Sequence, residues 1–430
     1  KFEISSVLSV SDKTGLINFA LMLKKAEVEI LSTGGTAKEL RSAGIKVTDV
    51  SEVTGFPEIL GGRVKTLHPK IHGALLARRD LIDHRRTIVQ QGINEIDLLV
   101  VNLYPFEDTL NFTDNNDALI EKIDVGGPAM IRAAAKNYEF VTVICDPEDY
   151  ASVTKSIEND GGTSLSLRRE LAAKCFARTA AYDSAIANWM AARHVDDLPS
   201  ITFNFGQKTT NLRYGENPHQ KAAFYIDETK QGNGLGNAIQ LQGKQLSYNN
   251  IADTDAALEC VKSFEEPTCV IVKHANPCGV ATDVDITEAY KKAFDADSTS
   301  AFGGIIALNR KLEEKTAQQI IDNQFVEVII APEVSTSAQK ILNAKENIRV
   351  LEMGNMEKLS SGFKFLSVTD GLLVQEIDNG SISAKDLKIV SSRDPTETEI
   401  QDCMFAWKVC KFVKSNAIVF AKNNQTVGVG

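Results

Sequence analysis

The chain has no apolar run long enough to cross a bilayer and no excess of positive charge, since its net charge is −10 at pH 7. A transmembrane helix needs about 20 predominantly apolar residues in succession, so the sequence argues against a membrane protein. An acidic chain also argues against broad nucleic-acid binding, although local basic pockets for phosphorylated small molecules are compatible with it. The first residues show no signal-peptide pattern, which favours a cytoplasmic protein.

Cysteine pairs and metal-ligand patterns are also scarce. The seven cysteines include no Cys-x-x-Cys pair, so we expect reduced thiols that pack as small core residues. His68 and His72 have the i, i+4 spacing of zinc-binding helices, but Pro69 lies between them and no Glu follows the first His. We therefore expect no metal ion and no tightly bound cofactor.

At 430 residues the chain is too long for one ordinary core. Strands alternate with helices along the first half, which predicts a parallel α/β domain with right-handed crossovers. The predicted strands cover residues 6–10, 28–31, 47–50, 97–101 and 140–145. A long helix over 167–193 precedes a segment with Asp, Pro and Ser at 195–200, so we place a domain boundary there, between residues 1–199 and 200–430.

Two strand-to-helix turns of the first domain have the composition of phosphate sites. One is Ser11-Asp12-Lys13 and the other is Thr33-Gly34-Gly35-Thr36. Glycine lets backbone amides approach an anion at a helix N-terminus. A lone Gly-Gly is more often a plain tight turn, but two such turns in one domain favour phosphate binding.

Further polar segments follow in the first domain. Arg63, Lys65 and Thr66 stand beside Gly61-Gly62, which suits an anionic ligand or an exposed basic loop. Asn102 and Tyr104 follow the strand at 97–101, and the tyrosine is either a hydrogen-bonding acid or a half-buried aromatic. Asp124 precedes Gly-Gly-Pro, where it is either a helix cap or a group beside a developing oxyanion. Lys136 is by default a surface lysine.

In the second half a short apolar strand at 268–272 runs directly into Lys273-His274. Open α/β sheets bind ligands at the carboxyl ends of their strands. Histidine can take a proton near neutral pH, and the neighbouring lysine can stabilise an oxyanion. The alternative is a strand that ends in two solvated polar residues. Upstream, Arg213 and Tyr214 lie in a turn-rich loop that suits a planar or phosphorylated ligand or forms an ordinary surface turn.

Taken together, these segments resemble the bifunctional purine-biosynthesis family that is both AICAR transformylase and IMP cyclohydrolase, in its bacterial type. The matching segments are 9–13, 32–36, 61–69, 102–106, 123–127, 133–137, 213–220, 273–279, 300–303 and 414–422. They are spread in family order along the whole chain. The resemblance implies an N-terminal methylglyoxal-synthase-like parallel α/β domain followed by cytidine-deaminase-like α/β transformylase subdomains.

The resemblance also implies an activity. It is formyl transfer from 10-formyltetrahydrofolate to AICAR, followed by cyclisation of the formylated nucleotide to IMP with loss of water. A deaminase metal site needs His-x-Glu and Pro-Cys-x-x-Cys motifs. His274-Ala275-Asn276 lacks the Glu and Cys278 has no second Cys three residues on, so we do not expect a zinc hydrolase.

The matching motifs also imply which residues of this chain form the two sites. The nucleotide of the first domain is expected at Ser11, Asp12, Lys13, Gly34, Gly35, Thr36, Arg63, Lys65, Thr66, Asn102 and Asp124. Its chemistry is expected around Lys65, Tyr104, Asp124 and Lys136, with Lys136 as the acid/base. In the second domain His274 would take the amine proton and Lys273 would stabilise the formyl oxygen. Substrate contacts there are expected from Arg213, Tyr214, Gly303, Glu327 and Asn416, and Glu327 stands where some members have Asp.

The resemblance finally implies a homodimer that acts on small molecules, namely AICAR, formylated AICAR, IMP and the folate, with no nucleic acid or membrane partner. The chain stops at Gly428-Val429-Gly430, and the family continues with further substrate and folate residues. We therefore expect an incomplete transformylase site. The alternative is a regulatory module that binds a phosphorylated metabolite, but Lys65, Tyr104 and Lys136 together favour catalysis.

Overall fold

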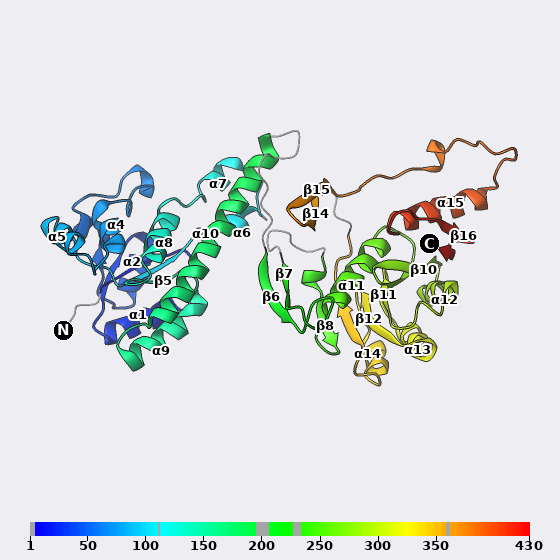
Figure 1. Cartoon of the computed structure of the whole chain (residues 1–430), viewed down its shortest axis with the longest axis horizontal. Coiled ribbons are helices and arrows are strands. Elements are labelled where there is room, and N and C mark those ends of the chain that lie inside the picture. Colours follow the sequence, from blue (N-terminus) through cyan, green and yellow to red (C-terminus); the bar gives the residue numbers. More distant parts are fainter. Residues whose placement is uncertain (1–4, 111, 195–205, 227–233, 358–361) are drawn as a thin grey trace. The chain divides into compact units, whose positions relative to one another are not determined.

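The computed structural model describes residues 5–110, 112–194, 206–226, 234–357 and 362–430. The chain forms two compact units, Lys1–Phe205 and Gly206–Gly430, and each has its own sheet (Figure 1). The boundary segment predicted at 195–200 lies outside the described residues. Within the described ranges, no helix is both long and apolar enough to cross a membrane.

The first unit is built on a five-stranded sheet in the order β3-β2-β1-β4-β5, and all of its pairings are parallel. The strands are β1 (Ser5–Val10), β2 (Glu29–Ser32), β3 (Thr48–Asp49), β4 (Leu98–Asn102) and β5 (Thr142–Ile144). The predicted parallel α/β fold is confirmed. The third strand is shorter than predicted, because the carboxylate of Asp49 accepts the N–H of Ser51 at 3.0 Å and starts helix α3 at Val50.

Helices cover both faces of this sheet. They are α1 (Leu16–Lys25), α2 (Gly34–Ser42), α3 (Val50–Thr54), α4 (Pro69–Leu76), α5 (Ile82–Gln90), α6 (Phe106–Leu110), α7 (Asn116–Ile120), α8 (Gly126–Lys136), α9 (Tyr150–Asp160) and α10 (Leu165–His194). Successive side chains of a strand point to opposite faces. Val7 therefore packs in the core that contains α4, α8 and α10, whereas Leu8 and Val10 pack in the core that contains α1, α2 and α9.

The second unit has a six-stranded mixed sheet in the order β10-β9-β11-β12-β13-β8. Its strands are β8 (Ile239–Gln242), β9 (Thr268–Lys273), β10 (Asn276–Thr282), β11 (Gly304–Leu308), β12 (Val326–Ala331) and β13 (Arg349–Glu352). Strand β9 is antiparallel to both of its neighbours, while β11, β12 and β13 are parallel to one another. The rule for the carboxyl ends of parallel strands therefore does not apply to Lys273 and His274.

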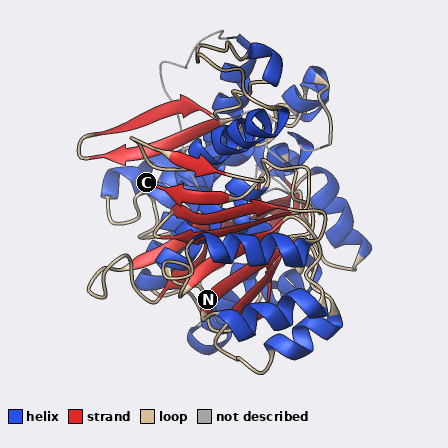
Figure 2. Cartoon of the chain, turned by 90° about the vertical axis from the view of Figure 1, so that its right-hand side faces the viewer, coloured by secondary structure: helices blue, strands red, loops and turns tan. Residues whose placement is uncertain are grey.

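Helices also cover both faces of the second sheet, as the strands and helices of Figure 2 show. Helices α12 (Ile286–Ala296), α13 (Glu314–Asn323) and α14 (Thr336–Leu342) pack against Ile271, whereas α11 (Tyr248–Val261) and α15 (Glu397–Cys410) pack against Val270 and Val272. Three two-stranded sheets complete the unit: β6 (Gln207–Leu212) with β7 (Ala222–Ile226), β14 (Phe363–Val368) with β15 (Gly371–Glu376), and β16 (Val419–Ala421) with β17 (Thr426–Val429).

Candidate active sites

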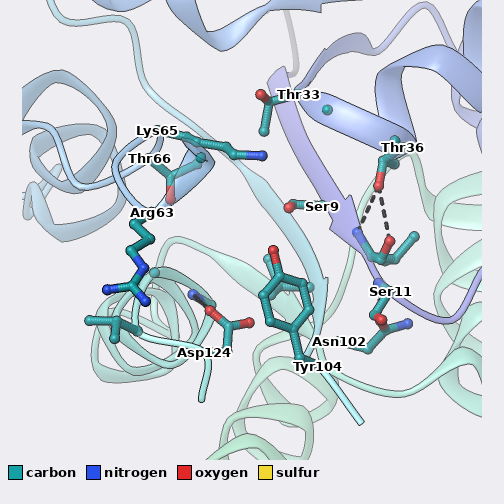
Figure 3. A pocket seen from close by; sticks show the side chains of 18 of the residues that line it. Ser9, Ser11, Thr33, Thr36, Arg63, Lys65, Thr66, Asn102, Tyr104 and Asp124 are labelled. Carbon is teal, nitrogen blue, oxygen red and sulfur yellow. Dashed lines mark hydrogen bonds between the residues drawn. The ribbon is translucent and has the colours of Figure 1, made fainter. Parts of the chain in front are cut away.

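A cavity of about 600 Å³ lies at the carboxyl ends of β1 and β4 in the first unit. Its walls come from the turn after β1, the start of α2, the loop before α4, the turn after β4 and the start of α8 (Figure 3). Most residues expected in the first site line it: Ser11, Lys13, Gly34, Gly35, Thr36, Arg63, Lys65, Thr66, Asn102, Tyr104 and Asp124. The parallel sheet explains this meeting, because it brings the ends of separate strands to one edge.

The N-terminus of α2 is an open anion site within this cavity. Gly34 has a φ of +56°, and a Cβ atom placed there would lie 3.2 Å from the Nζ atom of Lys65. A Cβ atom on Gly35 would lie 4.0 Å from the Nζ atom of Lys13. The side chain of Thr33, at the N-cap, does not cap the helix. Free amides and two ammonium groups thus face the same space, which suits a phosphate.

Two of the residues expected to hold the nucleotide also hold the backbone of the turn after β1. The hydroxyl of Thr36 is buried, accepts the N–H of Val10 at 3.0 Å and donates to its carbonyl oxygen at 3.0 Å. The Oδ1 atom of Asn102 accepts the N–H groups of Ser11 and Asp12, and its Nδ2 atom donates to the Asp12 carbonyl oxygen at 2.8 Å. These side chains shape the cavity because their hydrogen-bonding atoms point into the wall.

Asp124 occupies the N-terminus of α8, the second helix that starts at the cavity. Its Oδ1 atom accepts the N–H of Gly127 at 2.8 Å. Its own N–H donates to the hydroxyl of the buried Tyr182 at 2.8 Å, and that hydroxyl donates to the Lys122 carbonyl oxygen. Burial raises the pKa of the Asp124 carboxyl above its ordinary value, while neighbouring backbone N–H groups oppose the rise. Asp124 therefore combines a fixed position with an elevated pKa, as a proton acceptor requires.

Two cations of the cavity are paired with carboxylates. The Nζ atom of Lys65 lies 3.3 Å from Oε1 of Glu58, and Arg63 forms an ion pair with Glu121. The side chains of Arg63 and Glu121 are more than half exposed, so this pair contributes little stability and an anionic ligand can replace the carboxylate. Tyr104 is 43% exposed, and its hydroxyl points into the cavity toward Lys65 and Ser9 (Figure 3).

Two expected residues lie away from the cavity wall in the part of the chain that the structure describes. The carboxylate of Asp12 accepts the N–H and hydroxyl of Thr14 at 2.9 and 2.7 Å. Lys136 is exposed in the last turn of α8. Six residues of helix separate it from Met130, the last residue of α8 that lines the cavity, which at 1.5 Å per residue is about 9 Å. The structure thus does not bring Lys136 to the cavity of its own unit.

In the second unit Lys273 and His274 lie at a two-residue turn between β9 and β10. Lys273 pairs with Asn276 across the turn, and His274 and Ala275 have φ angles of 51° and 57°. Two positive φ angles match a type I′ hairpin turn, which usually has Asn or Gly at these positions. This conformation costs each non-glycine residue about 1 kcal/mol or more. The turn leaves the imidazole of His274 exposed.

The ammonium group of Lys273 is fixed by the segment before β11. Its Nζ atom donates to the Gly303 carbonyl oxygen at 3.0 Å. Gly303 has a φ of +68°, and a Cβ atom placed there would lie 3.1 Å from this Nζ atom. The exposed rings of Phe302 and Phe325 lie beside it, with centroids 5.5 Å apart. The motif at 300–303 predicted a role for Gly303, but it did not predict the pairing of Phe302 with Phe325.

The other expected residues of the second unit have separate contacts. Arg213 donates to the Tyr214 hydroxyl at 2.9 Å and stacks over its ring. Glu327 on β12 accepts from Nδ2 of Asn250 at 2.7 Å. Asn416 accepts from the Ser415 hydroxyl at 2.7 Å, and the preceding Lys414 donates its N–H to Oδ1 of Asn276 at 3.0 Å. This last contact joins the segment before Asn416 to the hairpin turn.

Two family models match the chain. The model of the MGS-like domain matches residues 15–129, and the model of the AICARFT/IMPCHase bienzyme matches residues 134–430. The second match covers more than half of the chain. The chain belongs to the AICARFT/IMPCHase bienzyme family. It is therefore a bifunctional enzyme, an AICAR formyltransferase and IMP cyclohydrolase, which catalyses the last two steps of IMP biosynthesis on small-molecule substrates.

One solved structure, described as "Crystal structure of ForH", is 38% identical to the chain and has a TM-score of 0.39. The match covers 44% of this chain and 98% of that one. The predicted membership of the AICARFT/IMPCHase family and its methylglyoxal-synthase-like first domain are confirmed by the family models. The regulatory module is not supported, because the bienzyme model extends through the whole second unit.

The sequence analysis did not predict some of the residues that support the two candidate sites. Tyr182 supports Asp124 from 58 residues away, and Asp253 contacts the hairpin turn from 22 residues away. Tyr182 lies on α10 and Asp253 on α11, and each meets its contact only in the folded chain, so no local motif marks it. Within the described residues, no group of three or more His, Cys, Asp or Glu could hold a metal ion.

Proposed function

We propose that the cavity of the first unit is the IMP cyclohydrolase site. The observation that carries this proposal is the meeting of Lys65, Tyr104 and Asp124 around one space that also contains the open N-terminus of α2. The nucleotide phosphate would bind the α2 amides between Lys13 and Lys65, because both ammonium groups border that turn.

Cyclisation joins the carboxamide nitrogen to the formyl carbon, so that nitrogen loses a proton while the formyl oxygen gains negative charge. In our proposal Asp124 takes the proton, because burial raises the pKa of its carboxyl. Lys65 and the Tyr104 hydroxyl stabilise the charge on the oxygen and pass protons to it. The oxygen leaves as water with two protons: the one taken from the carboxamide nitrogen, and the one that the formamido nitrogen loses as the ring C=N bond forms and the C–O bond breaks. Lys136 has no assigned role in the cavity of its own chain.

The hairpin turn of the second unit is, in the same proposal, the formyl-transfer centre. His274 takes the proton of the AICAR amine as the amine attacks the formyl carbon of 10-formyltetrahydrofolate. Lys273, held at the Gly303 carbonyl, stabilises the charge on the formyl oxygen. Tetrahydrofolate leaves with its nitrogen protonated, which balances the proton taken from the amine.

Other contacts in the second unit belong to this proposal. Arg213, Tyr214, Glu327 and Asn416 contact the nucleotide, and the Phe302–Phe325 pair offers a flat apolar surface to a heterocycle. The enzyme is proposed to work as a cytoplasmic homodimer.

The test measures both activities in one preparation. Formylated AICAR is added to the purified chain, and IMP formation is followed by absorbance. We expect Lys65→Ala to lower the cyclisation rate about 10²- to 10³-fold, as loss of an oxyanion donor does, and to spare formyl transfer. The matched control is Lys155→Ala on the exposed face of α9. A cyclisation rate in Lys65→Ala equal to that of the control would refute the assignment of the cavity.

A further inference from the structure

The Lys273–His274 turn needs support from outside its own hairpin. His274 and Ala275 both adopt left-handed backbone conformations, which L-residues with a Cβ atom avoid. Neither residue is the Asn or Gly that stabilises such a turn by itself. The orientation of the His274 imidazole therefore depends on what holds the backbone of Ala275.

Asp253 is the group that holds this backbone. Its Oδ1 atom accepts the N–H of Ala275 at 2.7 Å. Asp253 lies on α11, which starts with a capping box at Ser247 and is anchored in the core by Ala257 and Leu258. A rigid helix thus presents a half-buried carboxylate to the turn. A charged acceptor makes a stronger hydrogen bond than a neutral one, so this contact can maintain an unfavourable turn.

We propose that Asp253 is a positioning residue for formyl transfer. Its carboxylate locks the turn at Ala275 and thereby fixes the direction in which His274 faces the reacting groups, beside the Lys273 ammonium group that the Gly303 carbonyl holds. This inference rests on the proposed roles of Lys273 and His274 and adds a residue that touches neither substrate. Asn276 supports the opposite side of the turn, since its Nδ2 atom donates to the His274 carbonyl oxygen at 3.3 Å.

The charge of Asp253 is compatible with this role. Burial raises the pKa of its carboxyl, whereas the Ala275 N–H and the nearby His274 and Lys273 favour its ionised form. Asparagine at this position would keep an oxygen acceptor for the Ala275 N–H but lose the charge. Alanine would lose both the acceptor and the charge. Comparing the two variants therefore separates the contribution of the hydrogen bond from that of the charge.

The experiment compares Asp253→Ala and Asp253→Asn in the full chain with Asp255→Asn, two residues further along the same helix and on a different side of it. We expect Asp253→Ala to lower kcat for formyl transfer about 10- to 100-fold, with KM for AICAR changed less than about threefold, because misoriented groups slow chemistry more than binding. Asp253→Asn should recover most of the lost rate. Cyclisation in the first unit should stay at the wild-type rate in all three variants.

Hydrogen exchange at the Ala275 amide provides a second measurement that does not need turnover. The amide should exchange at least tenfold faster in Asp253→Ala and close to the wild-type rate in Asp253→Asn. The proposal is overturned by a wild-type kcat in Asp253→Ala, by a change in KM alone, or by an asparagine variant no better than alanine.

His274→Ala is assayed alongside. Full formyl transfer in His274→Ala would reject the proposed role of His274, and the exchange measurement would still decide whether Asp253 holds the turn.

Discussion

The two candidate sites obtain their functional side chains in different ways. In the first unit Lys65, Tyr104 and Asp124 come from three separate segments and meet at the carboxyl edge of a parallel sheet. In the second unit Lys273 and His274 are neighbours in sequence. A strained hairpin turn between antiparallel strands directs His274, and the Gly303 carbonyl holds the ammonium group of Lys273. The geometry of the first site therefore depends on many contacts, whereas the geometry of the second depends on the few groups that hold the turn.

This comparison predicts the largest effect for the histidine of the turn. We expect His274→Ala to lower formyl transfer about 10²- to 10⁴-fold, the usual contribution of a general base. Cyclisation should not change, because its residues belong to the other unit. Both rates are measured on one preparation, and His84→Ala, at an exposed position on α5, is the matched control. An equal loss of both activities would mean that the sites are not separate.

An intermediate effect is expected for the carboxylate of the cavity. Asp124→Asn should lower cyclisation about 10²-fold. In the wild type, cyclisation should fall as the pH drops through the pKa of Asp124, which burial places above the ordinary value of 3.8. That acid limb should be missing in Asp124→Asn. A wild-type pH profile in the variant would assign the limb to another group.

Asp124→Asn should affect the stability of the protein in the opposite direction from its effect on cyclisation. The folded-state pKa of Asp124 is raised, so its ionised form is disfavoured in the folded protein and ionisation lowers stability as the pH rises through that pKa. At neutral pH Asp124→Asn should therefore keep or raise the Tm while it lowers activity. A lower Tm would show that the hydrogen bond to Gly127 outweighs the effect of burial.

The smallest effect is expected for a residue that shapes the cavity wall. Thr36→Val leaves the buried N–H and carbonyl of Val10 without their hydroxyl partner, which costs about 1–3 kcal/mol. The Tm of the first unit should fall by roughly 2–10 °C. Thr33→Val is the matched control, because the Thr33 side chain caps no amide. Equal Tm values for the two variants would show that the Thr36 hydroxyl is not a structural anchor.

Local patterns were reliable where a short segment decides its own structure. The βα turns at Ser11 and Gly34 form as predicted because glycine, a following helix and a preceding apolar strand are all adjacent in sequence. The same patterns predicted Thr36 and Asn102 as ligands but not as supports of the cavity wall. Both have suitable polar groups, but in the folded chain these groups satisfy backbone atoms 26 and up to 91 residues away.

The sequence by itself determined the family, the parallel α/β character of the first unit and the segments that line its cavity, because glycines, charges and hydrophobic periodicity act over a few residues. Only the tertiary structure decided that Lys136 does not line the cavity, that β9 is antiparallel to its neighbours, and that Asp253 holds the Lys273–His274 turn. These outcomes depend on strand pairing and helix packing between distant segments, which no local pattern specifies.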